Sequence, residues 1–157
     1  MKEQKKYWNE FIIDWDESVY NSNSEGMILR EKIATYFRGV LVTRMNFAIE
    51  SLKEFIKNKK VIELGCGTGR FSKSLYDLGA HSVEGTDISD LAIKKANELF
   101  RKDLIPDEKF KFISTDLNSY ELNTDSNSVI VGLGILQYLS DEEIINFFKN
   151  KKINTIF

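Results

Sequence analysis

The feature that most constrains this chain is a short apolar run that ends in three alternating glycines. Residues 61–64 are followed by Gly65, Gly67 and Gly69, and a helix-like segment begins near Phe71. Glycine adopts positive φ at little cost and lets a ligand approach the main chain closely. The first turn of the following helix offers unpaired N–H groups. A strand, a glycine turn and a helix in this order predict a nucleotide-binding turn.

The glycine spacing separates two kinds of nucleotide-binding turn. The dinucleotide fingerprint, Gly-x-Gly-x-x-Gly/Ala, needs a small residue at its third position for close packing of helix on strand. That position holds Arg70, which disfavours an NAD-type oxidoreductase but leaves it open. The observed pattern, from Glu63 to Gly69, is Glu-x-Gly-x-Gly-x-Gly.

This pattern resembles motif I of the class I S-adenosylmethionine (SAM)-dependent methyltransferases. Three later segments resemble further motifs of the family in the same order. Residues 83–89 resemble its second strand, which has an acidic end, and residues 110–117 resemble its third strand, which ends in Asp. Residues 129–139 resemble its fourth strand and the loop that follows. Four motifs over roughly residues 60–148 are more specific than a lone glycine turn.

The resemblance implies an α/β fold, a Rossmann-like parallel sheet with helices on both faces and the family's strand order 3-2-1-4-5-7-6. Alternating strands and helices agree with a parallel sheet. We expect one domain, with an N-terminal helical cap over residues 1–57 and an incomplete SAM-binding core over residues 58–157, of about four strands out of seven. The fourth strand is then a sheet edge that a partner or a second copy could cover.

Local signals predict the individual elements of the core. Apolar runs predict strands, amphipathic spacing predicts helices, and Ser89 and the Ser140/Glu143 capping box mark helix starts. The expected strands are 61–64, 82–86, 109–114 and 129–133, and the expected helices are 70–78, 90–101 and 140–150.

The N-terminal third is expected to be ordered and helical. Aromatic residues within residues 1–24 argue against a disordered tail. Apolar spacing predicts helices over residues 27–37 and 40–56, with Gly39 separating or kinking them, and Ser22 with Glu25 predicts the start of the first.

The resemblance also implies where the cofactor, SAM, meets the chain. Asp87 would accept hydrogen bonds from the ribose hydroxyls, Asp116 would face the adenine amino group, and Glu63 would lie near the methionine amino group. The expected cofactor-binding residues are Glu63, Gly65, Cys66, Gly67, Gly69, Asp87, Ile88, Asp116, Leu117 and Gly132.

Several of these residues have a purely structural alternative. Asp87 could instead cap a helix, and Asp116 could instead be an ordinary loop residue, because Asp is common in turns. Ile88 and Leu117 could simply belong to the core. The Cys66 side chain is expected to pack rather than to act as a nucleophile.

The function implied is methyl transfer from SAM to an acceptor. A small molecule is favoured over a nucleic-acid base, and protein or RNA acceptors stay open. Base methyltransferases of this fold carry Asn/Asp-Pro-Pro-aromatic after the fourth strand, where residues 132–135 read Gly-Leu-Gly-Ile. No general base is assigned, because His81, the only histidine, precedes the second strand. The alternative is a catalytically impaired SAM-binding remnant or an interaction subunit.

Aromatic residues are candidates for the rest of the site, although packing of the helical cap explains them equally well. A lid over the cofactor could use Tyr7, Trp8, Trp15 and Tyr20, and the acceptor pocket could use Tyr36 and Tyr138.

Composition restricts the partners and the compartment. The net charge of −2 gives no strong attraction to nucleic acid. The single cysteine excludes an internal disulfide and fits a reducing compartment, so the cytoplasm is expected. The sequence has no long apolar stretch, so neither a membrane span nor a secretory signal is expected. No metal site is expected either.

Overall fold

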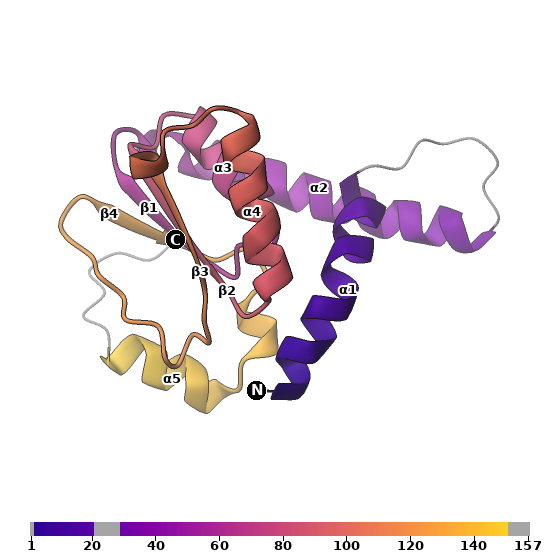
Figure 1. Ribbon diagram of the computed structural model, residues 1–157. Coiled ribbons are helices and arrows are strands. Elements are labelled where there is room, and N and C mark those ends of the chain that lie inside the picture. Colours follow the sequence, from indigo (N-terminus) through magenta and orange to yellow (C-terminus); the bar gives the residue numbers. More distant parts are fainter. Residues whose placement is uncertain (1, 21–28, 151–157) are drawn as a thin grey trace.

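A four-stranded parallel sheet forms the centre of the computed structural model, which describes residues 2–20 and 29–150 (Figure 1). Its strand order is β3-β2-β1-β4. The strands are β1 (Lys60–Leu64), β2 (Ser82–Asp87), β3 (Phe110–Ser114) and β4 (Ser128–Val131). The predicted α/β fold class is confirmed, and the order equals the first four positions of the expected one.

Helices surround this sheet. They are α1 (Lys2–Tyr20), α2 (Leu29–Ile56), α3 (Arg70–Asp77), α4 (Asp90–Lys102) and α5 (Asp141–Asn150), with short 3₁₀ turns η1 (Asp107–Lys109) and η2 (Leu136–Tyr138). The predicted separation at Gly39 was wrong, because α2 runs through this residue without interruption. The expected helix start at Ser22 and Glu25 lies outside the described residues.

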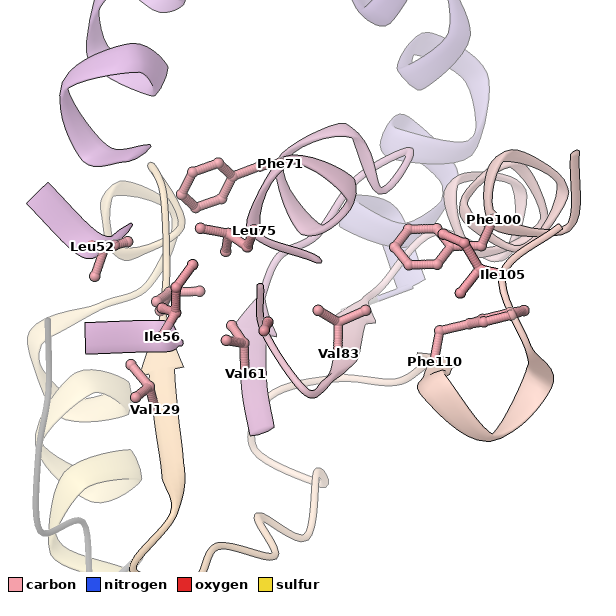
Figure 2. Packing of buried hydrophobic residues seen from close by; sticks show 12 residues of the cluster. Leu52, Ile56, Val61, Phe71, Leu75, Val83, Phe100, Ile105, Phe110 and Val129 are labelled. Carbon is pink, nitrogen blue, oxygen red and sulfur yellow. The ribbon is translucent and has the colours of Figure 1, made fainter. Parts of the chain in front are cut away.

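One face of the sheet packs against α2, α3 and α4. Alternate strand residues, such as Val61, Val83 and Val129, point to this face, where α2, α3 and α4 contribute large apolar side chains (Figure 2). The buried helix residues of this cluster are Leu52, Ile56, Phe71, Leu75 and Phe100. The intervening strand residues Ile62 and Ile130 point to the other face.

The second face is covered by α5 and by the chain that follows β3. Phe147 of α5 and Tyr120 pack there against Ile62 and Ile130. Strands buried on both faces explain the nearly continuous apolar sequence of β1 and β4.

A polar contact fixes the segment between β3 and β4. The Tyr120 hydroxyl donates to Glu84 Oε1 at 2.5 Å, and Lys60 Nζ lies 2.9 Å from Glu84 Oε2. Burial opposes ionisation of Glu84, but the bonds from Tyr120 and Lys60 prevail and lower its pKa. This contact holds the loop that carries Asp116 against the sheet.

Gly69 is the point where α3 approaches α4. It forms the N-cap of α3 with φ +80°, in the left-handed region. A Cβ atom on Gly69 would lie 2.8 Å from the Cβ of Ala96 on α4. Both the backbone conformation and the contact therefore require glycine.

We expect Gly69→Ala to lower the free energy of unfolding by about 1–3 kcal/mol, because it adds left-handed strain and a steric clash. Gly39→Ala is the matched control. A Cβ on Gly39 meets no atom within 4 Å, so this change should raise stability by about 0.5–1 kcal/mol. Urea denaturation measures both, and equal effects of the two changes would contradict the packing described for Gly69.

Candidate functional site

The candidate site is a cavity of about 290 Å³ at the carboxyl ends of the strands. Because all four strands are parallel, the loops that follow them meet at this edge of the sheet. The lining includes Gly65 and Gly67 after β1, Asp87 at the end of β2 with Ile88 after it, Asp116 and Leu117 after β3, and Gly134 and Ile135 after β4. This edge is where open parallel sheets bind their ligands.

The glycine turn after β1 is bonded to the end of β2. The Gly67 N–H donates to Asp87 Oδ2 at 2.9 Å, and Gly67 has φ +52°. A Cβ on Gly67 would meet no atom within 4 Å, so this residue borders open space. Gly65 differs, because its added Cβ would lie 2.8 Å from Ile135 Cδ1. The absence of a side chain there lets the loop after β4 close onto the turn.

The Asp87 carboxylate borders the cavity with acceptor capacity to spare. Its Oδ1 accepts from the Ser89 N–H at 2.9 Å, and its Oδ2 accepts from Gly67. A carboxylate has about four acceptor positions, so these bonds leave acceptor capacity for a ligand. Burial raises the pKa of Asp87, and the backbone N–H groups of Ser89, Gly67 and Ile88 oppose this rise. Hydroxyl groups of a sugar are donors that suit this acceptor capacity.

Helix α1 is bonded to the start of α4, directly after Asp87. Ser89 is the N-cap of α4, as predicted, and its Oγ accepts from the Ala92 N–H at 3.1 Å. The same hydroxyl donates to Asn9 Oδ1 of α1 at 2.7 Å. Lys5 Nζ lies 2.9 Å from Asp90 Oδ2. These contacts hold α1 beside the cavity.

One face of α1 forms a wall of the cavity. Gln4, Trp8 and Ile12 line it and are spaced by four residues, so they share a helix face. The Trp8 ring meets that of Tyr138 edge-on, with centroids 5.2 Å apart. Of the suggested lid and pocket aromatics, Trp8 and Tyr138 line the cavity, whereas Tyr7 does not and is 54% exposed. The side chains of Trp15, Tyr20 and Tyr36 lie outside those described.

Glu63 lies beneath the glycine turn and does not line the cavity. Its side chain is buried, and its carboxyl group accepts a hydrogen bond from the Ser72 hydroxyl of α3. Burial raises the pKa of Glu63 to about 8; the Ser72 bond opposes the rise and the nearby Asp87 charge adds to it. Glu63 is therefore largely protonated in the folded protein at neutral pH.

The predicted site residues divide into two groups. Those that line the cavity are Gly65, Gly67, Asp87, Ile88, Asp116 and Leu117. Those outside its lining are Glu63, Cys66, Gly69 and Gly132. Cys66 is a buried free thiol packed near Gly85, and His81 is exposed before the first residue of β2. Contact of any of them with a cofactor stays a prediction.

Further residues of the lining were not assigned from the sequence. They include Gln4, Ile12, Arg44, Thr86, Thr115, Asn118, Gln137, Leu139 and Glu143. The four-residue spacing from Trp8 is a signal that could have found Gln4 and Ile12. No comparable signal marks Arg44, whose position depends on how α2 packs.

Within the described residues, no three or more His, Cys, Asp or Glu side chains are grouped so that they could hold a metal ion. None of the described helices is long and apolar enough to span a membrane.

A parallel sheet of this order, with a glycine turn after β1 and a carboxylate at the end of β2, defines the class I SAM-dependent methyltransferase fold. Residues 61–152 match a family described as "Methyltransferase domain". The chain therefore belongs to this methyltransferase family.

Related proteins differ in what their names say they methylate. The chain is 28% identical over 153 residues to the eEF1A lysine and N-terminal methyltransferase homolog of Drosophila melanogaster, covering 93% of this chain and 20% of that protein. It is 31% identical over 147 residues to phosphoethanolamine N-methyltransferase 1 of Triticum aestivum, covering 91% and 26%. The chain thus spans about a quarter or less of these two relatives.

Solved structures share the fold. The magnesium protoporphyrin IX methyltransferase (ChlM) of Synechocystis PCC 6803 with bound SAM has a TM-score of 0.67 at 19% identity, over 93% of this chain and 68% of that one. A DhpI-SAM-HEP complex has a TM-score of 0.66 at 18% identity, over 94% and 57%.

The burial of Glu63 predicts a pH dependence of stability. The folded protein keeps a proton that the unfolded chain releases, between the ordinary glutamate pKa of 4.5 and the folded pKa of about 8. The free energy of unfolding should therefore decrease as pH rises through this window. Glu63→Gln has no proton to lose and can still accept the Ser72 bond, so its stability should fall less.

Urea denaturation between pH 5 and 8 measures this difference, and Glu121→Gln, at an exposed position, is the control. Parallel stability profiles for Glu63→Gln and the wild type would rule out a buried, protonated Glu63.

Proposed function

We propose that this chain binds SAM in the cavity and transfers its methyl group to a small-molecule acceptor. The observation that carries the proposal is the Asp87 carboxylate, which borders the cavity, is bonded to the glycine turn and keeps unused acceptor positions. Membership of the methyltransferase family supports the same function.

The residues present fit the adenosine part of this cofactor. Asp87 would hold the ribose hydroxyls through charge-assisted hydrogen bonds. Ile88 and Leu117 line the cavity near Asp116 and would enclose the adenine, whose amino group Asp116 would face. Asp116 Oδ1 already accepts from the Asn118 N–H at 2.7 Å, which fixes the orientation of its carboxylate.

The remaining walls would orient the reacting groups and exclude water. Gly67 leaves space beside the turn, since a Cβ added to this residue would have no atom within 4 Å. The edge-on pair of Trp8 and Tyr138 also forms part of the cavity wall. SAM supplies a methyl group that is already activated on a sulfonium, so the chain's main task is positioning.

The contribution of α1 supports a small acceptor. Gln4, Trp8 and Ile12 lie on the cavity side of α1, and the Asn9 and Lys5 contacts fix this helix against α4. A wall of this kind suits a compact molecule better than an extended polymer. The names of the relatives include both protein and small-molecule methyltransferases.

A SAM-binding remnant without activity is the second candidate. Among the described residues β4 pairs only with β1, so β4 is the edge of the sheet. The loop of Gly134 and Ile135 therefore lies at this edge, where the acceptor would bind. Methyl transfer from labelled SAM to a panel of small amines, alcohols and acids separates the two. Transfer eliminates the remnant, whereas binding without transfer to any acceptor favours it.

S-adenosylhomocysteine at about 100 times its Kd should stabilise the wild type by about 2.7 kcal/mol, which raises Tm by about 5–10 °C at this chain length. Asp87→Ala removes the ribose acceptors and should abolish the shift. Asp107→Ala is the control, because Asp107 is exposed on η1 and lies outside the cavity lining.

Differential scanning fluorimetry measures these shifts, with circular dichroism as the check of folding. A folded wild type without any shift would refute SAM binding, and a full shift in Asp87→Ala would refute the role of Asp87.

A further inference from the structure

We propose that Arg44 binds an anionic group of the methyl acceptor, so that the acceptor carries a phosphate or a carboxylate. The inference rests on the proposed methyltransferase function and specifies the chemistry of its substrate. Arg44 projects from α2, which sequence patterns identify only as an amphipathic helix.

Arg44 lies where the loop after β4 meets the cavity. Its side chain lines the cavity, and a Cβ on Gly134 would lie 2.8 Å from Arg44 Nη2. Gly134 has φ +82°, so the loop turns sharply at the residue that the guanidinium covers. The guanidinium of Arg44, an exposed side chain, therefore lies next to Gly134 at the rim of the cavity.

The sheet order separates Arg44 from the acidic end of the cavity. Asp87 ends β2 and Asp116 follows β3, on one side of β1, whereas Gly134 follows β4 on the other side. The proposed sugar and base sites lie at the acidic end. The end with Arg44 is left for the reacting groups and the acceptor.

Arg44 has donors available for a ligand. Among the described residues that line the cavity it is the one with a positive charge, and it forms no ion pair or hydrogen bond within the described part of the chain. The lining carboxylate of Glu143 accepts instead from the Ser140 N–H at 2.8 Å and from the Asn118 side chain at 3.2 Å. Gln4 and Gln137 add neutral polar groups.

A guanidinium has five N–H donors in a planar fork that matches carboxylate and phosphate oxygens. Charge-assisted bonds of this type are roughly twice as strong as neutral ones. An anion on the acceptor would gain attraction from Arg44 and would avoid the carboxylates at the other end of the cavity. The same chemistry could come from the carboxylate of the cofactor's methionine part, which the experiment has to distinguish.

The test titrates inorganic phosphate and acetate into the wild type, Arg44→Gln and Arg44→Lys by calorimetry, at constant ionic strength, with and without saturating S-adenosylhomocysteine. We expect at least one anion to bind the wild type and to bind Arg44→Gln about tenfold more weakly, with Arg44→Lys between them. Arg101→Gln is the control, because Arg101 is exposed on the last turn of α4, outside the cavity lining.

A second arm measures the affinity for S-adenosylhomocysteine and for 5′-methylthioadenosine, which lacks the amino-acid part. We expect both affinities to change less than about twofold in Arg44→Gln. A loss of about tenfold for S-adenosylhomocysteine alone would assign Arg44 to the cofactor and overturn the proposal. Anion binding that is equal in wild type and Arg44→Gln, or absent from both, would also overturn it.

The two proposals fail in different ways. If the wild type binds neither nucleoside, the proposed function is wrong, and the anion titration without nucleoside still tests Arg44. If the wild type binds both nucleosides and Arg44→Gln binds anions normally, only the acceptor proposal is wrong.

Discussion

The hydrogen bond from the Gly67 N–H to Asp87 Oδ2 joins the two loops on which the cavity depends. It links the turn after β1 to the end of β2, and the second oxygen of the same carboxylate caps the backbone at Ser89. One half-buried side chain therefore joins the glycine turn to the start of α4. Asn9 then bonds to Ser89, so α1 is positioned by the same chain of contacts.

The sequence predicted the features that depend on neighbouring residues, such as helix caps and the alternation of strands and helices. The Ser89 N-cap was confirmed, since a serine before an amphipathic run caps a helix by its own hydroxyl. The Ser140/Glu143 capping box was confirmed with both of its bonds, from the Ser140 N–H to the Glu143 carboxylate and from the Glu143 N–H to Ser140 Oγ. The parallel sheet followed from alternating strands and helices, and its order from the family resemblance.

Long-range packing set the features that the sequence did not predict. Gly39 costs a helix only about 0.5–1 kcal/mol, less than the burial of Leu52 and Ile56 further along α2 can supply. The helix therefore continues through it. Arg44 reaches the cavity because α2 passes close to the loop after β4, which no local pattern encodes. Burial and the Ser72 bond place Glu63 beneath the glycine turn, and its position near the methionine part of the cofactor stays a prediction.

A crystal structure of the chain with S-adenosylhomocysteine tests the central claim most directly. The account predicts that both ribose hydroxyls lie within hydrogen-bonding distance of the Asp87 carboxylate, with the Gly67 N–H still bonded to Oδ2 and the amino-acid part directed past Gly65. Nucleoside bound elsewhere on the molecule, or a glycine turn detached from Asp87 in the complex, would contradict it.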